Sequence, residues 1–391
     1  MTAPGETTPA PGAKPPAAGA ARARTRTLRK GVAAVNERPT SADGGRGGVD
    51  MSGVRASCLA LGLLIPGLAV ADPPPPPPPP KVVLKIATQA PEGTVWMEAL
   101  EDIKRAVARG TKGRVVFKFF ANGSMGEEGA VIEKIKLRTL GGGLFTGIGL
   151  GQILSEMRIL EVPFLYEGKG EIDAVKRAFE EEFRAGLAEK GFVFLGWAEV
   201  GWAYVFSKVP ARNLAELRQR KIWVWQADPL ANRVFEKFGL AGVPLALPDV
   251  LTALNTGMVD SVYNSPYGLV GLQWHRQVKY MSRMTVGHGT GALLVDAREW
   301  NKIPAPVRAR ILSVARKRLD RVCDEVAAKN EETIRELQEN GIKVVPIPVE
   351  EMPTYKKLGA EVADSLAGTL WRPETLARVR EIIAEERAKG R

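Results

Sequence analysis

The chain has 391 residues with a formal net charge of +11; 45% of them are hydrophobic, 25% are charged, and only two cysteines and two histidines occur. At about 100–200 residues per domain the length predicts two or three domains, and the ordinary composition excludes a wholly disordered or fibrous chain. Two cysteines cannot build a disulfide framework, two histidines argue against a histidine-built metal site, and no apolar run reaches the roughly 18–20 residues of a membrane-spanning helix.

Residues 1–50 contain almost no large apolar side chains and are rich in Ala, Pro, Gly, Thr and Arg. Such a segment cannot bury enough surface to offset its chain entropy, so we expect it to be disordered. It carries eight Lys or Arg against four acids. Part of the basic excess therefore belongs to this segment, which argues against nucleic acid as a partner of the folded body.

Residues 51–71 have the pattern of a secretory signal peptide. A short basic region, Met51–Arg55, precedes an apolar stretch over 56–68, and Ala69–Ala71 forms an Ala-x-Ala cleavage signal. Because such a signal begins a protein, we expect that Met51 is the true start and that residues 1–50 are a misassigned extension. Cleavage after Ala71 would release the protein into the periplasm. The alternative is a short buried helix behind a genuine polar tail.

Eight consecutive prolines follow, from Pro73 to Pro80, within a proline-rich linker over 72–81. They predict a polyproline II spacer of about 25 Å, at ~3.1 Å per residue. We expect the folded body to begin directly after this linker.

Short apolar runs alternate with helical patterns from residue 82 onward. This alternation predicts an α/β architecture, in which ligands bind beyond the carboxyl ends of the strands, in the cleft where domains meet. Strands are expected at 82–86, 114–120, 144–150, 192–195, 221–225, 243–245 and 343–347. Helices are expected at 96–107, 127–140, 230–238 and 306–339, with another beginning at 247.

We find no set of residues in the sequence that would form a catalytic or cofactor site. The glycine-rich stretch 141–151 fits neither a dinucleotide-binding nor a phosphate-loop register, and no serine lies in a Gly-x-Ser-x-Gly elbow. Cys323 falls inside the long predicted helix, while His275 and His288 are isolated in the sequence. We therefore expect no enzyme activity, no cofactor and no metal, and these absences disfavour the alternative of a secreted α/β enzyme.

Tryptophans gather in one region, where five of the eight lie within residues 197–274. Trp223 and Trp225 alternate along one predicted strand, so their side chains share a face. Tryptophan favours sites that combine an apolar surface with one hydrogen bond. Two interpretations stay open, an ordinary hydrophobic core or an aromatic-lined cleft for a solute.

A series of short motifs extends over nearly the whole folded body, from about residue 82 to 390. They include Leu84–Ala87, Asn122–Gly126, Leu160–Leu165, Asn213–Leu217, Leu251–Asp260, Trp300–Pro304 and Glu336–Gly341. Single motifs are weakly specific, but together their order and spacing resemble the DctP-like family. These proteins are the periplasmic solute-binding subunits of tripartite ATP-independent periplasmic (TRAP) transporters.

The resemblance implies a two-domain periplasmic-binding-protein-like α/β fold with a central cleft, crossing strands and a long domain-spanning helix. It also implies a receptor that captures a small solute without transforming it and presents it to separate membrane permease subunits. We expect a monomer with domain I over 82–205 and 285–325, and domain II over 206–284 and 326–391. A ligand sensor for a membrane signalling partner is an alternative that uses the same fold.

The sequence departs from the family where the solute would bind. The resemblance places an arginine that pairs with the ligand carboxylate at the position of Trp223, and a second arginine at that of Ala203. A carboxylate buried against indole would stay largely unpaired, at a cost of several kcal/mol. We therefore expect a hydrophobic or weakly acidic solute.

The two neighbouring tryptophans would form the apolar wall of this site, and polar side chains from both domains would orient the solute. Among the polar groups, Asn264 matches a ligand contact of the family. Alternatively, Lys208 or Arg233 reaches the cleft and restores carboxylate binding. The expected ligand-binding residues are Trp223, Trp225, Asn264, Tyr263, Gln89, Thr88, Tyr204 and Trp202.

Overall fold

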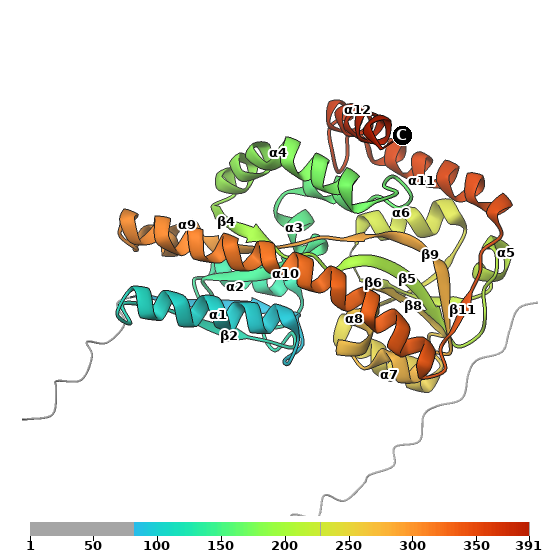
Figure 1. The fold of residues 1–391 in the computed structure, drawn as a ribbon, viewed down its shortest axis with the longest axis horizontal. Coiled ribbons are helices and arrows are strands. Elements are labelled where there is room, and N and C mark those ends of the chain that lie inside the picture. The colour runs from blue at the N-terminus through green and yellow to red at the C-terminus, as the bar shows by residue number, and fades with distance from the viewer. Residues whose placement is uncertain (1–81, 227, 391) are drawn as a thin grey trace, which may run out of the picture. The chain divides into compact units, whose positions relative to one another are not determined.

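The computed structural model describes residues 82–226 and 228–390. The expected upstream extension, the signal peptide with its cleavage after Ala71 and the proline-rich linker all lie outside these residues and stay predictions. Strands and helices alternate along the described chain, and the strands form two mixed sheets (Figure 1). We term the five-stranded sheet with the helices packed on it lobe I, and the six-stranded sheet with its helices lobe II.

The sheet of lobe I has the strand order β2-β1-β3-β10-β4. Strand β1 pairs parallel with β2 and β3, and β10 runs antiparallel to β3 and β4. Apolar residues that alternate with polar ones favour a strand at β1, where Leu84 and Ile86 are fully buried. The strands are β1 (Val82–Thr88), β2 (Val115–Phe120), β3 (Gly142–Thr146), β4 (Phe192–Trp197) and β10 (Gly291–Asp296).

The sheet of lobe II has the order β11-β9-β5-β8-β6-β7. Its strand β6 is a run of β-branched and aromatic residues, a composition that favours strands, and it pairs parallel with β7 and β8. The strands are β5 (Gly201–Ser207), β6 (Lys221–Trp225), β7 (Ala241–Leu245), β8 (Ser261–Asn264), β9 (Tyr280–Gly289) and β11 (Lys343–Val345).

The helices of the described chain cover both sheets (Figure 1). The α-helices are α1 (Val95–Gly110), α2 (Glu128–Lys136), α3 (Gly147–Ile153), α4 (Lys169–Glu189), α5 (Leu214–Leu217), α6 (Pro229–Phe238), α7 (Val250–Thr256), α8 (Pro266–Gly271), α9 (Ala297–Asn301), α10 (Ala305–Glu339), α11 (Met352–Leu366) and α12 (Pro373–Lys389). The 3-10 helices are η1 (Ser155–Glu161), η2 (Leu247–Asp249), η3 (Trp274–Gln277) and η4 (Val349–Glu351).

The chain crosses between the lobes from β4 to β5, from β9 to β10 and along α10. The two crossing segments are hydrogen-bonded to each other, since Ala198 N donates to Gly291 O at 2.7 Å and Val200 N donates to Gly289 O at 2.9 Å. The long helix α10 packs on α1 and β4 of lobe I and on α8 and β5 of lobe II (Figure 1). These features confirm the expected crossing strands and domain-spanning helix.

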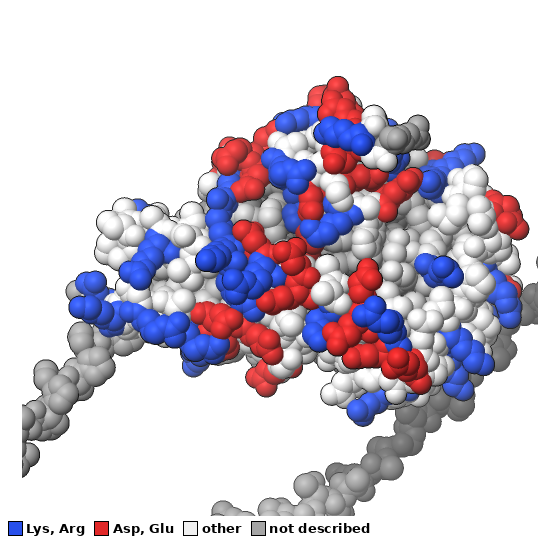
Figure 2. Space-filling view, viewed as in Figure 1, with Lys and Arg blue, Asp and Glu red and all other residues white. Residues whose placement is uncertain are grey.

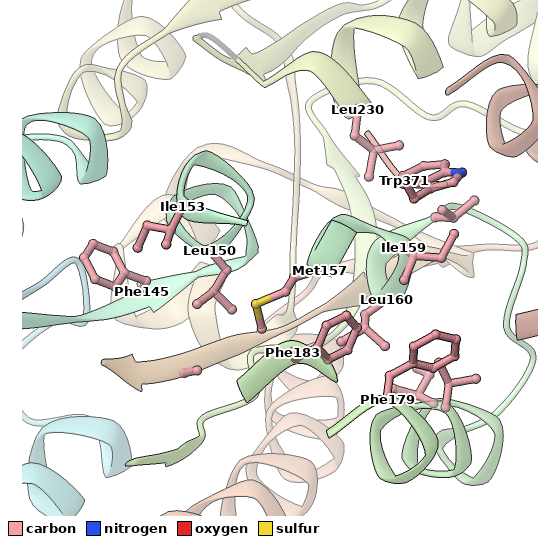
Figure 3. Close-up of a cluster of buried hydrophobic side chains, with 14 of the residues drawn as sticks. Phe145, Leu150, Ile153, Met157, Ile159, Leu160, Phe179, Phe183, Leu230 and Trp371 are labelled. Carbon is pink, nitrogen blue, oxygen red and sulfur yellow. The ribbon is translucent and has the colours of Figure 1, made fainter. Parts of the chain in front are cut away.

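A hydrophobic cluster continues from lobe I into α6 of lobe II. Figure 3 shows side chains of η1 between Phe179 and Phe183 of α4 on one side and Leu230 and Trp371 on the other. Two further helices cover this cluster: α12 packs on α4, and α11 packs on α6. The cluster holds η1 firmly in place, which matters for the site described below.

Opposite charges mix on the face of the molecule that Figure 2 shows, over α4, α10 and α12, and they do not form a patch of one sign. Some of them pair across helices, as Arg316 of α10 does with Glu180 of α4 at 2.6 Å. Exposed pairs of this kind contribute about 0–1 kcal/mol each. These surface pairs therefore contribute little to the stability of the fold.

The boundaries of some expected elements differ from those in the structure. The strand expected over 144–150 ends at Thr146, and α3 begins at Gly147, because Thr146 Oγ1 accepts from Ile148 N at 3.3 Å and caps the helix. The sheets change between Trp197 and Gly201 and between Gly289 and Gly291. The domain limits expected at 205/206 and 284/285 lie inside β5 and β9, and they stay a prediction.

Candidate functional site

A cavity of about 290 Å³ lies between the two lobes. Its wall combines the carboxyl ends of β1 and β3 from lobe I, parts of β5, β6 and β8 from lobe II, and the crossing segments around Val200 and Thr290. An engineered cavity of about 150 Å³ accepts benzene, so this cavity has room for a single-ring metabolite.

Six of the eight expected ligand-binding residues line this cavity, and they come from both lobes. A site that closes over a solute needs groups from each side, and the structure brings these groups together. Their role in binding stays a prediction. The six residues are Thr88, Gln89, Trp223, Trp225, Tyr263 and Asn264.

Trp223, Trp225 and Tyr263 form an aromatic wall. The Trp223 ring stacks on Tyr263 with centroids 5.1 Å apart and lies 5.7 Å from the Trp225 ring. Both indole N–H groups are in use, because Trp223 donates to Leu245 O at 3.1 Å and Trp225 donates to Glu127 Oε2 at 2.8 Å. The wall therefore offers ring surface to a solute. Trp223 is 1% exposed, so it is a core residue and a cavity residue at once.

Three of the expected polar side chains already form hydrogen bonds within the protein. Gln89 Nε2 donates to Gly126 O at 2.9 Å, and Thr88 Oγ1 accepts from the N–H two residues on, at 3.1 Å. Asn264 Oδ1 accepts from Ser265 N at 2.8 Å. The Nδ2 group of Asn264 is thus the part of that amide left to meet a solute.

Trp202 and Tyr204, the other two expected ligand-binding residues, do not line the cavity. Successive side chains of a strand point to opposite faces, and the residues of β5 that line the cavity are Gly201, Ala203 and Val205. The residues between them therefore belong to the other face of the sheet.

Three charged residues of the cavity wall were not expected from the sequence: Arg158, Glu161 and Asp228. Arg158 belongs to η1, which packs on α3 of lobe I, and Asp228 caps α6 of lobe II. Arg158 Nη2 donates to both carboxylate oxygens of Asp228 at 2.8 Å, and its Nη1 donates to Glu161. The sequence signal that could have revealed Arg158 is its charge inside the apolar run Met157–Leu160.

This triad leaves no unpaired cation in the cavity wall. Arg158 is the one Lys or Arg among the lining residues of the described chain, and both its terminal nitrogens are bonded. Burial alone would lower the pKa of Arg158, but the carboxylates of Asp228 and Glu161 raise it. Burial raises the pKa of Glu161, although Arg158 opposes this shift. Two buried carboxyl groups thus face one guanidinium.

The two basic residues considered as substitutes do not reach the cavity, which corrects that alternative. Lys208 Nζ donates to a backbone carbonyl of α7, and Arg233 Nη1 pairs with Glu236 at 2.9 Å. Neither lies in the cavity wall, whereas Trp223 and Ala203, at the positions where the resemblance places arginines, both do.

His288 lines the cavity beside a buried ion pair. Lys176 Nζ donates to Glu199 Oε1, and His288 Nε2 lies 3.7 Å from Glu199 Oε2. Burial lowers the pKa of His288 to about 4, although the Glu199 carboxylate opposes this shift. The folded protein therefore holds this imidazole neutral well below the pH at which it charges in the unfolded chain.

This histidine should cost the fold roughly 3 kcal/mol between pH 6.5 and pH 4. Over that range the unfolded chain takes up a proton that the folded chain refuses, so stability falls as the pH falls. Chemical denaturation from pH 7 to pH 4 should show that His288→Gln loses most of this dependence of stability on pH. The control His275→Gln, at the other histidine, should keep it. Parallel pH profiles for the unmodified protein and His288→Gln would contradict this expectation.

The remaining chemistry of the described chain is sparse. Within 82–226 and 228–390 no group of three or more His, Cys, Asp or Glu could hold a metal ion, and no helix there combines the length and hydropathy of a membrane span. Cys323 is buried, and burial raises the pKa of its thiol to about 11. It is therefore protonated at neutral pH and a poor nucleophile.

The model of the family described as bacterial extracellular solute-binding protein, family 7 (DctP), matches residues 86–368. The chain belongs to the DctP family. Proteins of this family are solute-binding receptors rather than enzymes, and those of TRAP transporters work with membrane permease components. The predicted receptor function is confirmed at this level.

Relatives of this DctP-family chain are distant but cover most of it. The C4-dicarboxylate-binding periplasmic protein DctP of Rhodobacter capsulatus is 20% identical over 340 residues, which are 85% of this chain and 97% of that protein. The 2,3-diketo-L-gulonate-binding periplasmic protein YiaO of Escherichia coli is 21% identical over 237 residues, 60% of this chain and 72% of that protein.

A solved structure confirms the two-domain fold of this DctP-family chain. It is a TRAP periplasmic solute-binding protein from Xanthobacter autotrophicus with bound β-D-galacturonate. The two folds agree with a TM-score of 0.71 at 20% identity, and the match covers 77% of this chain and 99% of that one.

Proposed function

We propose that this receptor binds a small organic solute with an apolar or aromatic body, neutral or weakly acidic, and delivers it to separate TRAP permease subunits. The observation that carries the proposal is the pairing of Arg158 with Asp228 and Glu161. A solute carboxylate would meet no unpaired cation in the described wall and would lie near two carboxyl groups. Burying a charge in such a place costs several kcal/mol.

The aromatic wall favours an apolar body. Trp225 and Tyr263 present ring surface, Trp223 packs against both of them, and Ala203 adds a small apolar side chain. Burying ~150–250 Å² of aromatic surface at ~25 cal/mol/Å² stabilises a complex by about 4–6 kcal/mol before ordering costs. This gain is large enough to replace a charge-assisted pair as the main source of affinity.

A neutral polar head would complete the fit. Three residues of the cavity wall hold buried polar atoms without a hydrogen-bond partner in the described chain, namely Arg158 Nε, His288 Nδ1 and Thr290 Oγ1. A buried polar group left unsatisfied costs about 1–3 kcal/mol. These three atoms are buried and offer no hydrogen bond at the cavity surface, so the half-buried amide of Asn264 is the group that would meet a neutral polar head.

The relatives named above are called binders of C4-dicarboxylate and 2,3-diketo-L-gulonate, and the solved structure holds β-D-galacturonate. All three solutes are acids. Each of them carries a carboxylate, so a departure from carboxylate solutes is the specific content of the proposal for this chain.

Isothermal titration calorimetry with matched pairs tests the proposal. We expect benzamide and phenylacetamide each to bind at least about tenfold more tightly than benzoate and phenylacetate, and succinate not to bind measurably. Lys208→Met is a matched control that should leave all affinities unchanged, because Lys208 lies outside the cavity wall. Tight succinate binding would overturn the proposal, and mass spectrometry of solute retained through mild purification would identify the natural ligand.

We also propose that residues 51–71 are a signal peptide cut after Ala71, which suits the extracytoplasmic role of the family, and that the receptor acts as a monomer. Sequencing the amino terminus of the secreted protein tests the cleavage. A mature chain that keeps residues before Met51 would contradict it.

A further inference from the structure

Arg158 and Asp228 form a buried, charge-assisted pair of the kind that an arginine forms with a carboxylate ligand, yet both partners belong to this chain. Arg158 Nη2 lies 2.8 Å from each carboxylate oxygen, and both side chains are 6% exposed. Charge-assisted pairs of this kind are among the strongest hydrogen bonds in proteins. The two residues come from different lobes, so the pair joins the lobes at the cavity wall.

Lobe I and the crossing segment hold the guanidinium without help from Asp228. Arg158 Nη1 donates to Glu161, and Glu161 Oε1 accepts from Thr290 N at 2.6 Å, beside the crossing from β9 to β10. Gly147 leaves room for this carboxylate, because a Cβ there would lie 2.1 Å from Glu161 Oε1. The guanidinium is therefore fixed in position before any partner arrives from lobe II.

Lobe II holds the carboxylate in a similar way. Asp228 Oδ1 accepts from Leu230 N at 3.0 Å and from Ala231 N at 3.2 Å, which caps the amino end of α6. Each half of the pair is thus built within its own lobe, and the halves meet when the lobes are together.

We infer that Asp228 is an internal carboxylate ligand, which occupies the carboxylate site of Arg158, ties the lobes together and excludes acidic solutes from the cavity. The inference deepens the proposed function and rests on it, since it names the residue that sets the preference for uncharged solutes. Removing this carboxylate would turn the cavity into a binding site for small monocarboxylates with an apolar body.

Asp228→Ser is the variant of choice. Serine is a good amino-terminal helix cap, so α6 keeps its cap while the carboxylate and its volume are lost. A free carboxylate could then reach the guanidinium beside the aromatic wall. We expect the affinity for benzoate to rise about 100-fold over the unmodified protein, and the ratio of benzamide affinity to benzoate affinity to fall correspondingly.

Asp296→Ser is the matched control. Asp296 is also buried, caps α9 through Arg298 N and Glu299 N at 2.9 and 3.2 Å, and pairs with the Arg298 side chain at 2.8 Å. It does not line the cavity. The same substitution there should leave benzoate binding unchanged.

The loss of Asp228 could unfold the protein, because Arg158 would lose one of its two counter-ions. Circular dichroism and denaturation of Asp228→Ser are therefore measured with benzoate, with benzamide and with neither. A benzoate-specific gain in affinity or benzoate-specific recovery of folding supports the inference. A folded variant with unchanged benzoate affinity, an equal gain in Asp296→Ser, or an unfolded variant that benzoate does not restore would each overturn it.

These outcomes are separate from a failure of the proposed function. That failure would appear in the unmodified protein, as a preference for benzoate over benzamide. A failure of the present inference would appear in Asp228→Ser alone.

Discussion

Trp223→Ala is expected to lower the free energy of unfolding by about 3–5 kcal/mol and to weaken solute binding at least tenfold. The side chain is 1% exposed and packs face to face on Tyr263 and edge-on against Trp274, with ring centroids 5.1 and 5.2 Å apart. Its removal leaves a large void in a close-packed core, because surrounding side chains relax only in part. The same removal takes away the ring against which Trp225 and Tyr263 pack in the cavity wall.

Trp274→Ala separates these two effects. Trp274 is equally buried in the same hydrophobic cluster, but it does not line the cavity. Urea denaturation should show a similar loss of stability in both variants, while calorimetry with benzamide, or with the retained solute once identified, should show a large loss of affinity only in Trp223→Ala. Equal losses of affinity would reduce Trp223 to an ordinary core residue.

The features that sequence reasoning predicted well are those set by local periodicity. The alternation of Lys221–Trp225 placed both of its tryptophans on one face, and the structure brings their rings within 5.7 Å. The apolar periodicity over 306–339 predicted a helix. The structure has this helix at Ala305–Glu339, one residue earlier at its start. Short-range geometry suffices for such predictions, because a strand or helix fixes where its own side chains point.

The features that it missed depend on which strands pair and on which segments meet. Trp202 and Tyr204 belong to β5, a strand that the sequence reasoning did not predict, so their face could not be assigned. Arg158 and Asp228 are 70 residues apart and belong to different lobes, and no local pattern links them. The sequence reasoning considered Lys208 and Arg233 instead, because they are closer in sequence to β6. Each of them binds a partner outside the cavity wall.

Arg158→Met is expected to destabilise the protein by about 3–5 kcal/mol at pH 7, because it leaves Asp228 and Glu161 buried without their shared counter-ion. Methionine is long, unbranched and apolar, so it fills much of the vacated space and the loss reports mainly on charge. Arg298→Met is the matched control. Arg298 pairs with buried Asp296 at a similar distance, 2.8 Å, but its side chain is 46% exposed, so this change should cost much less stability than Arg158→Met.

The pH dependence of the Arg158→Met deficit distinguishes lost charge pairing from lost packing. Burial already raises the pKa of Glu161 while Arg158 opposes that shift, so without the guanidinium this pKa should rise further. A carboxyl group whose folded pKa exceeds its unfolded value binds more protons in the folded state between the two values, so the fold gains stability as the pH falls. Chemical denaturation should therefore show the deficit shrinking from pH 7 to pH 5. A deficit that is constant over this range would mean that the arginine stabilises the lobes by packing, and the argument that Asp228 and Glu161 neutralise its charge would lose its basis.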